Sequence, residues 1–346
     1  MIGIRADANE QIATGHIMRC MTIADEIKKL GEKVIFYTAD DVVVELINSR
    51  GFNVEVLGSD WKNPVSEIDK LVDSVKKLGI KTMLFDSYSF RPEYFETFRA
   101  KAGADVKIAA MDDLAEEVFP VDYLINYNAY GITIDYEKMY GNDTRFLLGL
   151  MYAPLRPQFA DVPDRKSQNF PLKVLVASGG GDTYGIVPAM IREISKRKAL
   201  DDYDFHVILG QFAQSQNEIE RIIWCSHNIF RHDKVTAMAE LMSSCDIAIS
   251  ASGVMLSELC ATKTPTIYYV LADNQLPNAK YYGENGLMIN GGDIRDNVDR
   301  AAARILDELE ELASDKLMQR EYREKLKGLC DGRGAERLAR VLCGLE

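Results

Sequence analysis

The sequence has no stretch suited to crossing a membrane and no start typical of a secreted protein. No uncharged run approaches the ~18 residues that a membrane helix needs. The opening residues, MIGIRADANEQ, lack the basic start and the apolar run of a signal peptide. We therefore expect a cytoplasmic protein without membrane insertion.

Patterns typical of metal sites and disulfides are also missing. The 6 cysteines include no C-x-x-C pair, and no histidine stands at the spacing of a zinc ligand. We expect reduced thiols, most of them buried, with no metal site and no cofactor.

Positive charge is scarce. The chain has 41 Lys and Arg against 53 Asp and Glu, a net charge of −12. A negative field repels the phosphates of nucleic acids and anionic lipid headgroups, so neither is an expected partner. With 24 Gly and 10 Pro, the composition is not of low complexity. At 346 residues and 47% hydrophobic, the chain is long and apolar enough for two packed domains.

Short apolar runs alternate with amphipathic stretches in two successive series. This alternation predicts βαβ units on parallel sheets, and so an α/β fold of two Rossmann-like, doubly wound domains that face each other across a cleft. The first domain is expected over 1–154, a linker over 155–171, the second domain over 172–296, and C-terminal helices over 297–346. The expected helices of the two domains cover 17–30, 41–50, 66–79, 92–102, 184–198, 214–225, 235–244 and 254–262.

A histidine stands at the turn after the first expected strand. The run R-A-D-A-N-E-Q-I-A-T-G-H-I-M-R-C places His16 in the first turn of a helix, with Thr14 or Gly15 at its cap. A helix N-terminus disfavours the imidazolium ion, so we expect His16 to be neutral and able to accept a proton near pH 7. A polar residue that only caps its own turn would explain the same pattern.

Two turns of small residues each lie between a strand and a helix of the second domain. They are S-G-G-G-D at 178–182 and A-S-G-V-M-L-S-E at 251–258. Such turns let the backbone approach an anion closely and present helix N–H groups to phosphate. Neither is G-x-G-x-x-G or G-x-x-x-x-G-K-[ST], which argues against dinucleotide and P-loop sites. Glu258, one helical turn further on, could accept ribose hydroxyls or be a solvated carboxylate.

Polar groups also follow other strands. D-S-Y at 86–88, D-D at 112–113 and N-Y-N at 126–128 would line the same edge of the first domain as His16. A-D-N-Q at 272–275 could donate amide hydrogens to a pyrophosphate or a sugar. Helix caps and turns would explain any one of these motifs alone.

Taken together, these motifs resemble a known family. R-A-D…G-H-I-M-R-C, D-D, L-I-N-Y-N, L-G-x-x-Y-A-P-L-R, S-G-G-G-D, M-A-E-L-M-S-S-C-D-I-A-I-S-A-S-G…S-E and the N-Q turn resemble the UDP-2,4-diacetamido-2,4,6-trideoxy-β-L-altropyranose hydrolases of pseudaminic acid biosynthesis. Related spore-coat polysaccharide proteins share them, and the resemblance covers nearly all of residues 1–290. It implies a GT-B fold similar to the lipid-II-forming N-acetylglucosaminyltransferase.

The resemblance also implies roles for residues. His16 would be the base that activates water at the anomeric carbon of a UDP-sugar, without a metal ion. Met255 and Ser257 depart from the family's pattern, in which a threonine and an aromatic residue precede the glutamate. The implied UDP contacts are Ser178, Gly179, Gly180, Gly181, Ser252, Gly253 and Glu258. The implied substrate contacts are Arg5, Asp7, Gly15, Tyr88, Asp112, Asn126, Asn274 and Gln275.

Three other functions remain open. A glycosyltransferase of the same fold would use an acceptor in place of water. A sugar-nucleotide sensor would keep the binding site without turnover. A 2-epimerase would need further carboxylate and histidine groups that we cannot place in the sequence.

Overall fold

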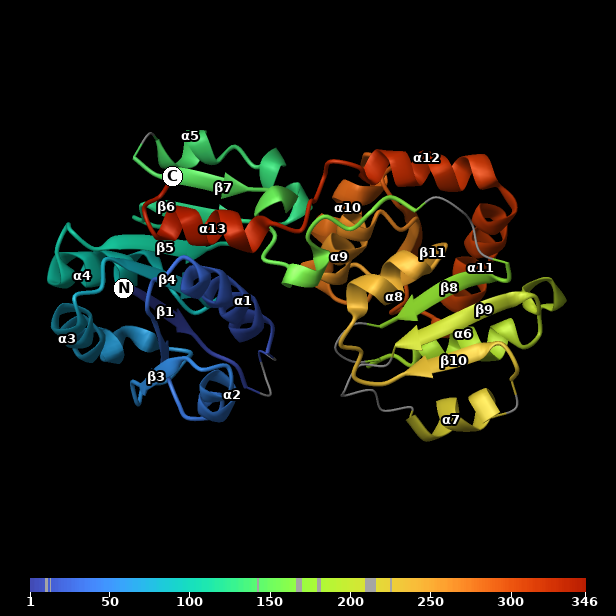
Figure 1. The fold of residues 1–346 in the computed structure, drawn as a ribbon, viewed down its shortest axis with the longest axis horizontal. Coiled ribbons are helices and arrows are strands. Elements are labelled where there is room, and N and C mark those ends of the chain that lie inside the picture. The colour runs from blue at the N-terminus through green and yellow to red at the C-terminus, as the bar shows by residue number, and fades with distance from the viewer. Residues whose placement is uncertain are drawn as a thin grey trace. The chain divides into compact units, whose positions relative to one another are not determined.

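The computed structural model describes residues 1–9, 12, 14–141, 143–165, 170–178, 182–208, 216–224 and 226–346. The chain forms two compact units (Figure 1). Unit 1 comprises residues 1–156 and 333–346, and unit 2 comprises residues 157–332.

Unit 1 contains a seven-stranded parallel sheet in the order β3-β2-β1-β4-β5-β6-β7. The strands are β1 (Ile2–Ala6), β2 (Val34–Thr38), β3 (Asn53–Val56), β4 (Thr82–Asp86), β5 (Lys107–Met111), β6 (Tyr123–Asn126) and β7 (Arg145–Leu148). The helices are α1 (Gly15–Lys29), α2 (Val44–Ser49), α3 (Ile68–Leu78), α4 (Pro92–Ala102), α5 (Tyr136–Tyr140) and α13 (Gly334–Leu342).

The central strands of unit 1 are buried along their whole length. Every residue of β1, β2 and β4 is buried, because helices cover both faces of the sheet. One face packs on α3 and α4, where Phe85 makes edge-to-face contacts with Phe95 and Phe98. The predicted helices 17–30 and 92–102 are confirmed as α1 and α4.

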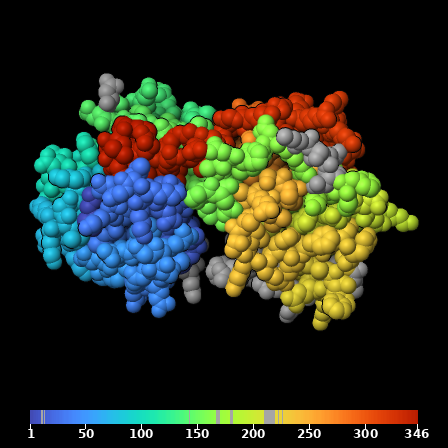
Figure 2. Space-filling model, in the orientation of Figure 1, coloured from blue at the N-terminus to red at the C-terminus, as the bar shows by residue number. Residues whose placement is uncertain are grey.

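The end of the chain returns to unit 1. Helix α13 packs against α1 and against residues 150–152, and its surface lies beside theirs in Figure 2. A Cβ at Gly334 would lie 2.2 Å from the carbonyl oxygen of Ala153, so only glycine permits this approach. The hydroxyl of Thr82 donates to the Leu342 carbonyl at 2.9 Å. Residues 297–346, expected only as C-terminal helices, therefore divide between the two units.

Unit 2 contains a six-stranded parallel sheet in the order β10-β9-β8-β11-β12-β13. The strands are β8 (Leu172–Ala177), β9 (Tyr203–Ile208), β10 (Ile229–His232), β11 (Ile247–Ala251), β12 (Thr266–Val270) and β13 (Ile289–Asp293). The helices are α6 (Ile186–Ile194), α7 (Gln216–Trp224), α8 (Met238–Ser244), α9 (Met255–Thr262), α10 (Leu276–Glu284), α11 (Val298–Ser314) and α12 (Lys316–Leu326).

The core of unit 2 lies largely between its sheet and the pair α6 and α11. Ile191 of α6 and Ile305 of α11 are fully buried in one apolar cluster with strand residues such as Val176. Most of the expected linker, 157–171, also belongs to this unit, and its Phe159 is buried.

The two sheets share one topology. Both follow the doubly wound order 3-2-1-4-5-6, with β7 added at the edge of unit 1. The predicted α/β fold of two Rossmann-like domains is confirmed. In such sheets, ligands bind at the carboxyl ends of the strands where the order reverses, which is between β1 and β4 in unit 1 and between β8 and β11 in unit 2.

None of the helices within the described ranges combines the length and the apolar character that a membrane span requires.

Candidate active site

His16 lies where the strand order of unit 1 reverses. It occupies the first turn of α1, which follows β1, and its side chain is 8% exposed. Thr14 is the N-cap residue but makes no side-chain cap bond, so His16 is not part of a capping arrangement with it. Gly15, the first residue of the helix, is exposed, and a Cβ there would meet no atom within 4 Å.

A buried carboxylate holds the His16 ring. Nδ1 of His16 lies 2.6 Å from Oδ1 of Asp86, the last residue of the neighbouring strand β4. An ionised carboxylate only accepts hydrogen bonds, so Nδ1 carries the hydrogen and donates it to Asp86. The Nε2 atom then keeps its lone pair and can accept a proton. The arrangement is that of an oriented general base.

Arg19 neutralises this carboxylate. Its Nε and Nη2 bind the two oxygens of Asp86 at 2.6 and 2.5 Å, and its Nη1 donates to Asp113 at 2.9 Å. Nη1 also donates to the hydroxyl of Tyr127 at 2.6 Å. Arg19 belongs to the G-H-I-M-R-C motif, but the sequence predicted no role for it. Its spacing of three residues from His16, which places both on one helix face, is the signal that could have found it.

The charged groups in this cluster change one another's pKa values. Burial alone would raise the pKa of Asp86, but the Arg19 guanidinium and the His16 ring outweigh burial and hold that pKa well below its usual range. Burial raises the pKa of Tyr127 to about 12. Asp86 is therefore ionised and Tyr127 neutral near pH 7.

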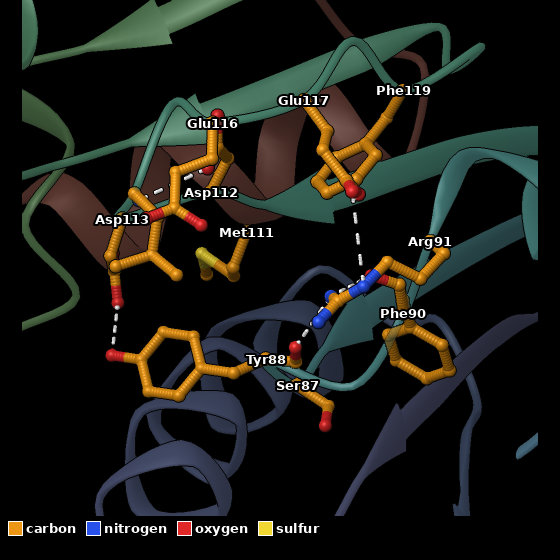
Figure 3. Close-up of a pocket in the computed structure, with 11 residues that line it drawn as sticks. Ser87, Tyr88, Phe90, Arg91, Met111, Asp112, Asp113, Glu116, Glu117 and Phe119 are labelled. Carbon is orange, nitrogen blue, oxygen red and sulfur yellow. Dashed lines mark hydrogen bonds and ion pairs between the residues drawn. The ribbon is translucent and has the colours of Figure 1, made fainter. Parts of the chain in front are cut away.

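Tyr88 and Asp113 form an accessible wall beside His16. The Tyr88 side chain is 44% exposed, and its ring meets the imidazole edge-on with the ring centres 4.8 Å apart. Its hydroxyl donates to Oδ2 of Asp113 at 3.1 Å, and Figure 3 shows the phenol pointing at that carboxylate. Of the predicted substrate contacts in unit 1, Tyr88 is the one with a half-exposed side chain next to the base.

Arg5 and Asp7 lie in the interior instead. The Arg5 side chain is fully buried and binds both oxygens of Glu67, at 2.7 and 2.9 Å, and Asp7 at 2.6 Å. Asp7 in turn accepts a hydrogen bond from the Ala39 amide at 2.7 Å. These bonds occupy the guanidinium of Arg5. We therefore assign Arg5 and Asp7 a structural role, in which they support the ends of β1 and β2, instead of the predicted role in substrate binding.

Asp112 and Asn126 are also engaged within unit 1. Asp112 is 5% exposed and accepts hydrogen bonds from the amides of Leu114 and Ala115 at 3.1 and 2.8 Å. Asn126 is fully buried and donates to the Tyr136 hydroxyl at 3.0 Å. Asp112 shapes the loop that carries Asp113, and Asn126 accepts from the Asn128 amide in the next loop, as expected of turn-forming residues.

In unit 2, the turn after β8 differs from its prediction. Gly179, Gly180 and Gly181 lie outside the described residues. Asp182 accepts hydrogen bonds from the amides of Ile186 at 2.8 Å and Val187 at 3.1 Å, at the start of α6. The expectation that this helix offers those N–H groups to phosphate is therefore wrong, because a carboxylate already caps them. Ser178 is 2% exposed, and its hydroxyl has no hydrogen-bond partner among the residues that the structure describes.

The second turn of unit 2 fits an anion better. The N-cap residue of α9, Val254, makes no side-chain bond to the helix. The Ser252 amide and hydroxyl donate to the Tyr269 carbonyl at 2.9 and 2.7 Å, which fixes the turn on β12. A Cβ at Gly253 would lie 3.8 Å from Nε2 of Gln275, so two predicted contact motifs come together here. The Gln275 side-chain oxygen accepts from the Leu271 amide at 3.1 Å, which leaves its amide nitrogen turned toward Gly253.

Asn274 and Glu258 lie on the same edge of this sheet. Asn274 is exposed in the short turn 273–275 after β12. Glu258 is half-buried in the first turn of α9. Glu258 follows the Ser252–Gly253 turn along the chain, and Asn274 precedes Gln275, whose amide faces Gly253. The roles of both residues stay predictions.

The cysteines and acidic groups form no metal centre in the described part of the chain. No group of three or more His, Cys, Asp or Glu side chains there could hold a metal ion. Cys20, Cys245, Cys260 and Cys330 are buried free thiols, and Cys343 is partly exposed. Cys20 contributes to the site by donating to Oδ2 of Asp86 at 3.3 Å.

Known proteins resemble this chain in sequence and in fold. The family described as "Protein of unknown function (DUF354)" matches residues 183–324. An uncharacterized protein of Methanocaldococcus jannaschii, MJ1062, is 23% identical over 81% of this chain and 57% of its own length. The UDP-2,4-diacetamido-2,4,6-trideoxy-beta-L-altropyranose hydrolase of Campylobacter jejuni is 21% identical over 82% of this chain and 96% of its own length.

A third relative combines two activities in its name. The pseudaminic acid cytidylyltransferase and UDP-2,4-diacetamido-2,4,6-trideoxy-beta-L-altropyranose hydrolase of Helicobacter pylori is 23% identical over 79% of this chain and 45% of its own length. The chain thus spans about half the length of two of these three relatives and nearly all of the other.

Solved glycosyltransferase structures match the whole chain in fold. The glycosyltransferase of kitacinnamycin has a TM-score of 0.68 and 14% identity, and covers 99% of this chain and 98% of its own. MurG of Acinetobacter baumannii has a TM-score of 0.68 and 12% identity, and covers 99% of both chains. The GT-B fold implied by the motifs is confirmed. In sequence, the chain is similar to proteins named as UDP-sugar hydrolases of pseudaminic acid synthesis.

Proposed function

We propose that this chain is an enzyme that hydrolyses a UDP-linked diacetamido-trideoxy sugar at its anomeric carbon. The products would be UDP and a free sugar for synthesis of a pseudaminic-acid-type nonulosonate. The observation that carries the proposal is the His16–Asp86 pair, because it leaves Nε2 of His16 as an oriented acceptor at the strand reversal of unit 1. The names of two relatives supply the substrate.

The chemistry asked of His16 is removal of one proton. Nε2 takes the proton from a water molecule as the water oxygen attacks the anomeric carbon, and Asp86 stabilises the imidazolium that forms. The bond from the anomeric carbon to the bridging oxygen breaks, and its electron pair leaves with UDP. Attack from the face opposite UDP would invert the anomeric centre.

We assign the leaving group to unit 2 and the base and the sugar to unit 1. The start of α9 lies directly after β11, at the strand reversal of unit 2, where backbone N–H groups that precede the helix would donate to phosphate oxygens. Glu258 would accept the ribose hydroxyls. The sugar would then bind to unit 1, which is residues 1–156 and 333–346, and UDP to unit 2, which is residues 157–332. These bounds replace the domain boundaries expected from the sequence.

Turnover in ¹⁸O-labelled water tests the proposal. Purified protein is incubated with the UDP-diacetamido sugar and, separately, with a panel of other UDP-sugars. The masses of both products are then measured by mass spectrometry. Attack at carbon places the label on the free sugar and none on UDP. Label in UDP or UMP would mean attack at phosphorus and would overturn the assignment.

A glycosyltransferase is the second candidate, favoured by the solved structures that share the fold, which are named as glycosyltransferases. It would release UDP slowly or not at all until an acceptor is supplied. UDP-sugar binding without turnover under either condition would indicate a sensor instead.

A further inference from the structure

A small pocket opens beside the Tyr88–Asp113 wall. It lies between the loops that follow β4 and β5, and Figure 3 shows the side chains around it. Its volume of about 30 Å³ is enough for one small group and far too small for a sugar ring. Apolar side chains make up much of the lining: Phe90, Met111, Leu114 and Phe119.

The pocket also holds an acceptor without a donor. The Glu117 side chain is 41% exposed, but its Oε2 atom is buried and has no hydrogen-bond partner within the described parts of the chain. The nearest cation is Arg91, whose Nε lies 3.9 Å from Oε1 of Glu117, beyond hydrogen-bond range. A ligand that supplies an N–H or O–H there would give this oxygen a hydrogen-bond partner.

Arg91 offers the complementary donor. Its Nη1 donates to the carbonyls of Tyr88 at 2.9 Å and Phe90 at 2.8 Å, which fixes the guanidinium at the pocket wall. The Arg91 side chain is 58% exposed, and neither of these bonds uses Nη2, so the hydrogens of Nη2 can reach a carbonyl on a ligand.

We propose that this pocket binds an acetamido substituent of the sugar. The amide N–H would donate to Glu117, the amide carbonyl would accept from Arg91, and the methyl would lie among Phe90, Met111 and Phe119. No hydroxyl offers all three features at once. The inference rests on the proposed function for the identity of the sugar, and it assigns Glu117 and Arg91 as specificity-determining residues that sequence reasoning missed.

Two variants test the pocket in different ways. Glu117→Leu removes the acceptor at similar size, and Leu114→Trp fills the pocket from its exposed rim, since Leu114 is 49% exposed. The first measurement is the ratio of kcat/KM for the UDP-diacetamido sugar to that for an analogue with one acetamido group replaced by hydroxyl. We expect each variant to lower this ratio by about 10- to 100-fold. Glu96→Ala, on the exposed side of α4, is the matched control and should leave the ratio unchanged.

The second measurement does not depend on turnover. Saturation transfer from the protein to the acetyl methyl of UDP-N-acetylglucosamine should be strong in the unaltered protein and weak in Leu114→Trp. If the unaltered protein hydrolyses the UDP-sugar but both variants keep its ratio, the pocket assignment is wrong and the hydrolase stands. If no UDP-sugar is hydrolysed but the methyl signal falls in Leu114→Trp, the pocket stands and the hydrolase fails.

Discussion

The carboxyl edges of the two sheets have the same topology but differ in how their polar groups are paired. In unit 1, the strand reversal carries a packed set of paired charges, in which Asp86 binds both His16 and Arg19. In unit 2, the corresponding reversal carries the start of α9, whose N-cap residue Val254 makes no side-chain bond, and a Ser178 hydroxyl that has no hydrogen-bond partner among the described residues. A side chain that moves protons needs its partners in place beforehand, whereas a site for an anion needs donors that are still free.

The two helix starts of unit 2 repeat the contrast on a smaller scale. Asp182 caps α6 with its own carboxylate, whereas the N-cap residue of α9, Val254, makes no side-chain bond to its helix. A carboxylate at a helix start stabilises the helix and repels a phosphate. We therefore expect α9 to contribute more than α6 to UDP binding.

The largest expected effect is that of His16→Asn. Loss of a general base lowers kcat by about 10²- to 10⁴-fold, while the UDP site of unit 2 keeps its affinity. Steady-state kinetics and calorimetry with UDP measure the two quantities. The control is His227→Asn, at an exposed position of unit 2. Normal turnover in His16→Asn would remove this residue from the mechanism.

The next effect is on stability. Asp86→Asn leaves His16 and Arg19 without their buried anionic partner, so we expect the free energy of unfolding near pH 7 to fall by about 3–5 kcal/mol. Urea unfolding of both proteins measures the difference. An unchanged midpoint would mean that Asp113 alone suffices to pair Arg19.

The same pair predicts a pH dependence. The pKa of Asp86 is lower in the folded protein than the ~3.9 of an unfolded aspartate, so its stabilisation is complete above that value and is lost as the pH falls towards the folded pKa. The stability difference between the unaltered protein and Asp86→Asn should therefore be largest at neutral pH and shrink below about pH 4. A difference that grows on acidification would contradict the ion pair.

Most of the fold could be predicted because its signals are local. Helix α4 begins at Pro92 and ends before Gly103, which has a φ of 98°, and its predicted bounds are those of the structure. Strand β13 was missed because its sequence, INGGD, has few of the residues that favour strands. Strand β7 (Arg145–Leu148) was also missed.

The partners within the site were harder to predict. Arg5 looks like a binding group at a strand end, and its pairing with Glu67 joins residues 62 positions apart. Similarly, the Arg19–Asp86 pair depends on β4 lying beside β1, which only the sheet order decides. Sequence patterns identified which strand ends carry polar residues, but not which of these residues neutralise one another.

A smaller effect is expected for Glu258→Ala. Loss of charge-assisted hydrogen bonds to the ribose should weaken UDP binding by about 1–3 kcal/mol and leave the base in unit 1 untouched. Calorimetry checks the affinity, with Glu284→Ala on exposed α10 as the matched control. Unchanged UDP affinity in Glu258→Ala would move the ribose contact to another residue.

The smallest expected effect is that of chelation, which should leave turnover unchanged. A departing diphosphate needs positive potential, and the N-terminal end of α9 can supply it through backbone N–H groups without a divalent ion. Turnover is measured after extensive treatment with EDTA and again after addition of Mg²⁺ or Mn²⁺. Activity lost in EDTA and restored by either ion would mean that the leaving phosphate relies on a metal. The edge of unit 2 would then need a cation in addition to its backbone N–H groups.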